Sequence, residues 1–259
     1  MFNMDNIKVE FETDGKNYDV LENALDNVIN NNNIKDDIIT FCEIGVRGGG
    51  GLATMFKTIQ KKECKTYVGI GIDPYGNIPY NSHENHRNST YDYTNKMKNQ
   101  FLFNMYKIAS ICDFNFLFFC LEDTEFFNRY SDGVPFYNKT KHMITKYHLI
   151  HFDGPHTLSQ VYQEVLFFHK RAVSGTIFVF DDTYVFTTLE DLEQALTSRN
   201  DCSLKKTDFS YDHETGMYFE FYNHQQIDRW LLSNGYTRFY NNKTEDEFYK
   251  CSKKAYIKN

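Results

Sequence analysis

Two apolar stretches in the middle of the chain end in side chains that can carry out chemistry. The stretch from Tyr147 to Phe152 leads into Asp153 and, three residues later, His156, and a second apolar stretch leads into Asp181 and Asp182. Buried strands of a parallel sheet read as nearly continuous apolar runs, and ligands bind just beyond the carboxyl ends of such strands. The sequence therefore predicts a crevice with three carboxylates and one imidazole, which is the candidate active site.

A glycine-rich turn follows the first strand that we expect in the core, residues 38–46. The run EIGVRGGGG occupies positions 43–51, and the apolar residues after it are spaced as in a helix. A strand, a glycine turn and a helix form the first unit of nucleotide-binding α/β folds, because glycine lets the backbone approach a ligand and the helix start offers free N–H groups. Arg47 stands where the dinucleotide pattern G-x-G-x-x-G demands glycine, so that pattern does not match.

Acidic residues also follow the next two expected strands. The strand at 67–72 ends on Asp73, and an acid at this tip can accept both hydroxyls of a ribose. The strand at 114–121 ends on Glu122 and Asp123, where the edge of an adenine could be read. Each carboxylate also has a structural interpretation, as a helix cap or a solvated loop residue. Their arrival at successive strand tips favours an enzyme over that interpretation.

An alternation of strands and helices positions these tips. It predicts the α/β class: a Rossmann-like, doubly wound, mostly parallel sheet with an antiparallel C-terminal edge. We expect further helices at 18–29, 92–110, 124–130, 157–172, 189–197 and 225–233, hairpins within 204–222 and 236–253, an edge strand at 7–12, a long loop at 76–91 and a turn at 133–135. Residues 1–259 are expected to form a single domain, with a lead-in at 1–37, a core at 38–185 and a C-terminal part at 186–259.

Composition bounds the function classes. The 259-residue chain carries a net charge of −7 and a pI of about 5.7, so no basic footprint points to nucleic acid or to an anionic membrane. Six cysteines lie scattered without a CxxC pair, which favours reduced thiols and a cytoplasmic location. No apolar run is long enough to span a bilayer, so we expect a soluble protein. The sequence leaves a homo-oligomer open.

Four motifs in this order resemble a known family. The run from Glu43 to Gly49 resembles the cofactor motif of class I S-adenosylmethionine-dependent methyltransferases. Together with IDPY at 72–75, HFDGPH at 151–156 and FDD at 180–182, it is similar to the macrocin O-methyltransferase-like group. Enzymes of that group methylate sugar hydroxyls of natural products with a bound magnesium ion. The resemblance covers roughly residues 38–185, and residues 186–259 match no pattern that we can name.

The resemblance implies a role for each matching residue and the class I methyltransferase fold. Implied contacts to the cofactor S-adenosyl-L-methionine are Glu43, Gly45 and Gly48 for the methionine portion, Asp73 for the ribose and Asp123 for the adenine; implied magnesium ligands are Asp153, Asp181 and Asp182, and the implied general base is His156. The sequence departs from the family at Gly50-Gly51-Leu52, where a small polar residue or alanine usually follows the paired glycines.

The chemistry of methyl transfer to a sugar agrees with these roles. A sugar hydroxyl is a poor nucleophile at neutral pH and must lose its proton as it attacks the sulfonium methyl group. A divalent cation held by carboxylates acidifies and orients the hydroxyl, and a neutral imidazole can take its proton. The expected function is a divalent-metal-assisted O-methyltransferase whose partner is a small-molecule or glycan hydroxyl acceptor.

Two alternatives stay open. One is a nicotinamide-dependent oxidoreductase on a similar Rossmann sheet, against which Arg47 in place of glycine speaks. The other is a non-catalytic methyltransferase-like module that binds a partner, and the presence of three carboxylates together with His156 speaks against it.

Overall fold

The structure is a computed structural model, and it describes most of the chain. The described residues are 18–31, 34–59, 66–81, 90–109, 114–155, 157–183, 185–186, 188–198, 209–213, 216–219 and 224–259. The edge strand expected at 7–12 lies outside these ranges, as does His156.

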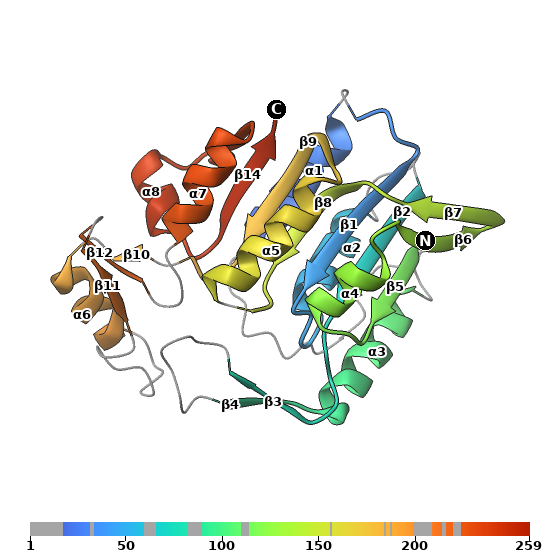
Figure 1. Cartoon of the computed structure of the whole chain (residues 1–259), viewed down its shortest axis with the longest axis horizontal. Helices are drawn as coiled ribbons and strands as arrows, with labels where there is room; N and C mark the ends of the chain where they lie inside the picture. Colours follow the sequence, from blue (N-terminus) through green and yellow to red (C-terminus); the bar gives the residue numbers. More distant parts are fainter. Residues whose placement is uncertain are drawn as a thin grey trace.

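A seven-stranded sheet forms the centre of the fold (Figure 1). Its five parallel strands are β1 (Ile38–Ile44), β2 (Thr66–Ile72), β5 (Asn115–Phe119), β8 (Tyr147–Phe152) and β9 (Ala172–Phe180). They lie in the order β5-β2-β1-β8-β9, which is the 3-2-1-4-5 order of doubly wound folds. β14 (Lys254–Lys258) pairs antiparallel with β9, and β13 (Tyr236–Arg238) pairs antiparallel with β14. The predicted fold class is confirmed, including its antiparallel C-terminal edge.

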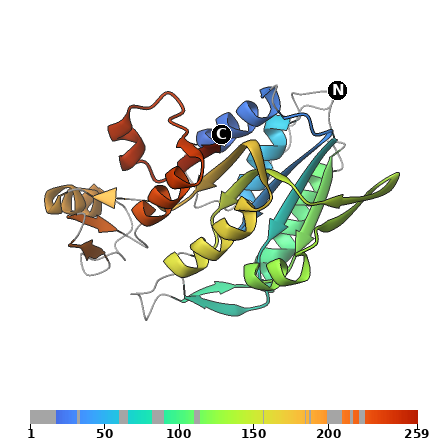
Figure 2. The same cartoon turned by 45° about the horizontal axis from the view of Figure 1, so that its top comes forward.

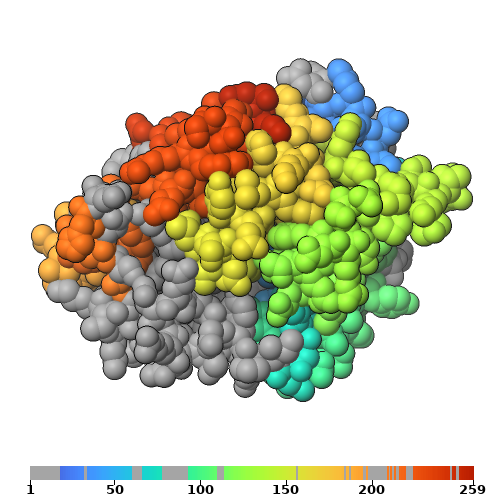
Figure 3. Space-filling view, viewed as in Figure 1, coloured from blue at the N-terminus to red at the C-terminus, as the bar shows by residue number. Residues whose placement is uncertain are grey.

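Helices cover both faces of this sheet. The buried side chains of α1 (Asp19–Asn30), α2 (Gly50–Ile59) and α3 (Asn95–Ala109) belong to one apolar cluster. Those of α4 (Asp123–Arg129), α5 (Leu158–His169), α7 (His224–Ser233) and α8 (Glu245–Lys250) belong to another. The two cartoon views place α1 and α5 on opposite sides of the sheet (Figures 1 and 2). In the space-filling view the second set of helices covers the face toward the reader (Figure 3).

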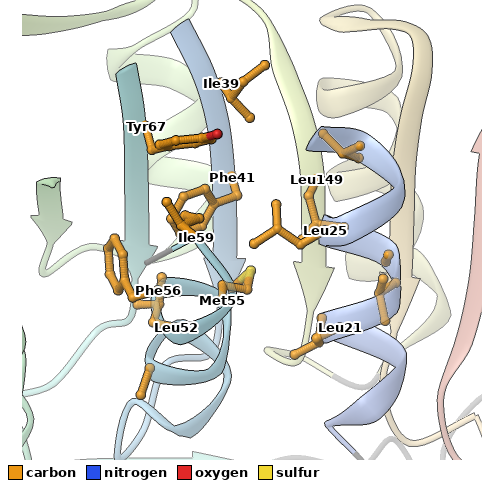
Figure 4. Close-up of a cluster of buried hydrophobic side chains, with 14 of the residues drawn as sticks. Leu21, Leu25, Ile39, Phe41, Leu52, Met55, Phe56, Ile59, Tyr67 and Leu149 are labelled. Carbon is orange, nitrogen blue, oxygen red and sulfur yellow. The ribbon is translucent and has the colours of Figure 1, made fainter. Parts of the chain in front are cut away.

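The first cluster shows why the α1 and α2 sequences form helices (Figure 4). Leu21 and Leu25 recur at a spacing of four, which brings both to the side of α1 that meets β8. From α2, Met55 and Phe56 pack on the same face of the sheet, and Phe56 meets Phe41 of β1 edge to face at 5.1 Å between ring centroids. Packing of these apolar stripes fixes α2 directly after the glycine turn, and α2 in turn fixes the turn.

Aromatic rings fill the opposite layer. Phe152 and Phe180, the last residues of β8 and β9, stack with ring centroids 4.5 Å apart. Phe126 of α4 and Phe168 of α5 are fully buried beside them. Because the rings lock the carboxyl ends of β8 and β9 together, the residues that follow these strands start from fixed positions.

The peripheral elements differ in part from the predictions. Residues 133–135 do not form the predicted turn, since β6 (Val134–Asn138) and β7 (Thr140–Ile144) pair as a hairpin that turns at Lys139, whose φ is 59°. The predicted loop at 76–91 contains β3 (Ile78–Asn81), which pairs with β4 (Thr90–Tyr93). The sequence signal for this hairpin is a set of tyrosines at alternate positions on either side of a polar connection. A search for apolar runs overlooks such a signal.

The C-terminal part combines a confirmed hairpin with a corrected one. β11 (Ser210–Asp212) and β12 (Met217–Phe219) pair as predicted within 204–222, and β10 (Val185–Phe186) adds to them beside α6 (Leu189–Ser198). The hairpin predicted within 236–253 is wrong, because α8 lies between β13 and β14. Thr244 and Glu247 form a capping box at the start of α8, a T-x-x-E signature that is visible in the sequence. Among the helices described, none is both long and apolar enough to cross a membrane.

Candidate active site

The predicted site residues gather at the carboxyl edge of the central sheet. Gly45, Asp73, Asp153 and Asp181 are each the first residue after a parallel strand. The backbone N–H of each still donates to the last carbonyl of the neighbouring strand, at N···O distances of 3.0 to 3.1 Å. The sheet ladder therefore fixes where these four residues begin, and side-chain partners decide the rest.

The glycine turn is held in one conformation by its neighbours. Gly45 has a φ of 78°, and a Cβ atom there would lie 1.9 Å from the carbonyl oxygen of Asp153. Arg47 takes a φ of 44°, which is unusual for a residue with a side chain, and its N–H donates to Asp73 Oδ2 at 2.8 Å. The Tyr75 hydroxyl donates to the carbonyl of Arg47. Gly48 lies in this turn and is half-buried.

Asp73 has one carboxylate oxygen engaged and one unengaged. Its side chain is buried, and Oδ1 has no hydrogen-bond partner among the residues that the structure describes. Burial raises the pKa of Asp73 to about 7, against the opposing effect of the N–H groups of Arg47 and Val46. A buried acceptor without a donor is costly, so a ligand hydroxyl that donates to Oδ1 would be stabilised here.

Glu43 is buried beneath the start of α2 rather than facing outward. Its Oε2 accepts the N–H of Leu52 at 2.9 Å, and its Oε1 lies 2.8 Å from Nδ1 of His151. A Cβ atom on Gly51 would lie 1.8 Å from Oε1, so the glycine makes room for this carboxylate. The contact of Glu43 with a cofactor stays a prediction, because both of its oxygens already have protein partners.

The carboxylate of Asp181 is paired with a buried lysine. Lys253 precedes β14 directly, and its ammonium donates to Asp181 Oδ2 as a buried ion pair. Burial would raise the pKa of Asp181, but Lys253 and then His151 bring it below its ordinary value. Burial and the charge of Asp181 raise the pKa of Asp153 well above its ordinary value, although Lys253 opposes this. Asp182, at a φ of 52°, donates its N–H to Asp181 Oδ1 at 2.8 Å.

A different set of side chains lies at metal-ligand distances. Glu43, His151 and Asp153 offer ligand atoms that all lie within 4.8 Å of one another. In the part of the chain that the structure covers, this is the group found, whereas Asp153, Asp181 and Asp182 do not form one. The role of these three residues as magnesium ligands stays a prediction, and so does the role of His156.

Asp123 meets a second buried carboxyl group. It is the first residue of α4, and its Oδ2 is buried without a hydrogen-bond partner in the described ranges. Glu164 of α5 is fully buried, and neither of its oxygens has one. Burial, and then the neighbouring Asp123, raise the pKa of Glu164 well above its ordinary value. Burial also raises the pKa of Asp123. One proton shared by the two carboxyls would join one oxygen of each group, and the adenine role of Asp123 stays a prediction.

Sequence reasoning missed three buried residues at this edge: His151, Glu164 and Lys253. His151 interrupts an apolar strand and lies opposite Glu43 in the β1–β8 register, so a polar residue inside an apolar run was the available signal. Glu164 lies on the apolar side of α5, which is a comparable signal. Lys253 gave none, because its position depends on the pairing of β14 with β9.

One hollow among the described residues lies away from the candidate residues. It has a volume of about 800 Å³ and is lined by polar residues of α1 and of the turn after β13, with Phe239 and Ile257. None of the candidate residues lines it. We locate the site from the carboxylates at the strand ends, since these positions follow from the sheet.

Comparison with known proteins gives likeness at the level of structure. No family model and no curated protein matches the chain. The O-methyltransferase NovP is 15% identical over 79% of this chain and 79% of its own, with a TM-score of 0.43. CalS11, a TDP-rhamnose 3'-O-methyltransferase of calicheamicin biosynthesis, is 14% identical over 63% of this chain and 62% of its own, with a TM-score of 0.37.

The MycE methyltransferase of the mycinamycin pathway, solved with Mg and SAH, is 15% identical over 70% of this chain and 44% of its own, with a TM-score of 0.31. These three solved structures are methyltransferases. At these identities and TM-scores, the function has to be argued from the site.

Proposed function

We propose that the protein is an S-adenosylmethionine-dependent O-methyltransferase that acts on a hydroxyl of a sugar, a glycan or a glycosylated metabolite. The observation that carries this proposal is the sign of the charge at the glycine turn. The Glu43 carboxylate accepts an N–H at the start of α2, where a nucleotide-binding fold otherwise presents free donors to phosphate. A site built this way favours a cationic ligand.

The same feature argues against the nicotinamide alternative. A dinucleotide places a pyrophosphate on the first turn of this helix. Here that turn already receives the Glu43 carboxylate, whose Oε2 accepts the N–H of Leu52. A diphosphate would meet like charge, whereas a sulfonium would meet opposite charge.

The donor side of the site fits the cofactor. S-adenosylmethionine supplies an electrophilic methyl group on a positively charged sulfur. The unengaged Oδ1 of Asp73 can accept a ribose hydroxyl, while Oδ2 holds the glycine turn through Arg47. Gly45 and Gly48 allow the backbone of the turn to come close to the methionine portion, and Asp123 lies after β5, where the adenine is expected.

On the acceptor side, the chain must hold a hydroxyl and remove its proton. Asp153 follows β8 at the same edge of the sheet and can accept a hydrogen bond from the hydroxyl. His156 follows Asp153 by three residues and is our proposed general base. A positioned base contributes about 10²–10⁴-fold to the rate. We expect His156→Ala to lower kcat by that order, measured with an accepted sugar, while SAH affinity stays near wild type; a near-normal kcat would remove His156 from the mechanism.

A divalent ion on Asp153, Asp181 and Asp182 does not fit the arrangement as it stands. Lys253 already occupies Asp181 Oδ2, so an ion there would lose one carboxylate and face an ammonium. The metal-assisted form of the reaction therefore stays a prediction of the family resemblance, and the steps above need only side chains of this protein.

Calorimetry tests the proposal directly. Titration with SAH, the product form of the cofactor, should show saturable binding, and titration with NAD⁺ should show none. Wild-type protein would then be incubated with S-adenosylmethionine and a panel of sugars and glycosides, with the added methyl group detected by mass spectrometry. Binding of NAD⁺ without binding of SAH would overturn the proposal in favour of an oxidoreductase, and binding of neither would favour a non-catalytic module.

A further inference from the structure

A lysine ammonium lies among the acidic residues of the acceptor side. The Lys253 side chain is 1% exposed, and the partner carboxylate of Asp181 is 10% exposed. The Tyr18 ring lies over the ammonium, with Nζ 5.3 Å from the ring centroid. The charge is therefore enclosed by protein, and its compensation must come from the groups around it.

The register of the sheet determines this position. In the antiparallel β9–β14 pair, Lys254 lies opposite Phe180, so Lys253 comes opposite Asp181. Side chains alternate along a strand, and Val179 and Ala255 belong to the cluster on the α1 side of the sheet. Asp181 comes two residues after Val179, and Lys253 comes two residues before Ala255, so both side chains point to that same side.

The surrounding charges are mainly negative. Asp153 follows β8 next to Asp181, and Glu43 lies one strand further. Of these carboxylates, Asp181 accepts directly from the buried Lys253 ammonium. A single ammonium thus supplies positive charge where the sequence alone predicts a need for a divalent cation.

We propose that Lys253 is the resident cation of this site: its ammonium takes the place among Asp153, Asp181 and Asp182 where a divalent ion would otherwise bind. The inference rests on the proposed function only for its catalytic consequence, that methyl transfer requires no added metal. The claim about the ion itself concerns charge and space, and metal binding can test it without cofactor or acceptor.

The test is a titration of the 259-residue protein with Mn²⁺, in which binding is measured by calorimetry and by the electron paramagnetic resonance signal of the free ion. Wild type should show no saturable binding that depends on Asp181. Lys253→Met keeps the length of the side chain and removes the charge, so it should bind Mn²⁺ saturably and show a higher Tm with Mn²⁺ than without it. Asp181→Asn in the Lys253→Met background should abolish that binding.

Lys254 provides a matched control. It is also buried, but its ammonium donates to the carbonyl oxygens of Thr183 and Cys251 rather than to carboxylates. Lys254→Met removes a buried lysine from the adjacent position and should create no Mn²⁺ site. If Lys254→Met binds Mn²⁺ as well as Lys253→Met does, the new site is not the acidic cluster and the inference is wrong.

Two further results would overturn the inference. One is saturable Mn²⁺ binding to wild type that Asp181→Asn abolishes, because the ion and the ammonium would then share the site. The other is a Lys253→Met protein that does not bind Mn²⁺, or that is insoluble whether or not it is prepared with Mn²⁺. The SAH titration is independent of these outcomes, so failure of the proposed function and failure of this inference can be told apart.

Discussion

Asp73 and Asp181 occupy equivalent positions in the fold and have opposite electrostatics. Each is buried and follows a parallel strand directly, and each donates its backbone N–H to the neighbouring strand. Burial raises the pKa of Asp73 to about 7, and its partners are backbone N–H groups. The pKa of Asp181 lies below its ordinary value, although burial opposes this, because Lys253 is beside it.

The difference shows that the end of a strand determines where a carboxylate lies but not whether that carboxylate is charged. Backbone donors offset only part of the cost of burying a carboxylate, whereas a full ammonium can reverse its effect on the pKa. The carboxylate of Asp73 therefore keeps an oxygen that a ligand hydroxyl can bind, whereas the carboxylate of Asp181 is already paired with Lys253. Three predictions follow this contrast, from the largest expected effect to the smallest.

Removal of the ammonium should have the largest effect. Lys253→Met leaves Asp181 buried and unpaired, and loss of one partner of a buried ion pair costs about 3–5 kcal/mol of unfolding free energy. Urea denaturation without divalent ions would measure it. In the double variant with Asp181→Asn, much of this loss should be recovered, since no charge is left unpaired. Equal losses in the single and double variants would show that Lys253 acts through packing and not through Asp181.

Asp73→Asn should weaken SAH binding by about 1–3 kcal/mol, because it removes a charged acceptor from the ribose hydroxyls. The sign of the pH effect follows from the raised pKa. At pH below 7 the free Asp73 is largely protonated, and hydroxyl donors favour its charged form, so binding should release a proton and affinity should rise as pH increases through 7.

Calorimetry in two buffers with different ionisation enthalpies would measure the released proton. Asp73→Asn should lose both the proton release and the pH dependence. Asp132→Asn, a change at an exposed acid, serves as the control and should behave as wild type. A pH-independent affinity in wild type would contradict the assignment of Asp73 to the ribose.

Glu164→Gln should have the smallest effect and should change the slope of stability with pH. The folded-state pKa of Glu164 is raised, so the native state binds a proton that the unfolded state has lost, and stability falls as pH rises above the ordinary carboxyl range. The glutamine amide can donate to Asp123 and does not titrate. The variant should therefore be more stable than wild type by about 1 kcal/mol at pH 8. Thermal melts from pH 5 to 8 would show it; the exposed Glu190→Gln should leave the slope unchanged.

The sequence sufficed for the parallel strands of the sheet and for the backbone positions of the site. Apolar runs at 38–46, 67–72 and 147–152 predicted the parallel strands, because strands buried on both faces leave a strong signal. The carboxylates at their ends followed from that register. The side-chain partners of these carboxylates could not be predicted. Lys253 is positioned by β14 and Glu164 by α5, and no local sequence pattern indicates a contact across 72 residues such as that between Lys253 and Asp181.

The close approach of Gly45 to the Asp153 carbonyl has a mechanical consequence. The turn after β1 rests on the turn after β8 with no space for even a methyl group between them. Gly45 lies on the side proposed to bind the methyl donor, and Asp153 lies on the side proposed to bind the acceptor. The two turns are thus in direct backbone contact, so thermal motion should move the donor and acceptor sides together and change the distance between them little. In-line displacement depends on a fixed distance between the reacting atoms, and this contact would supply it without any lid or hinge.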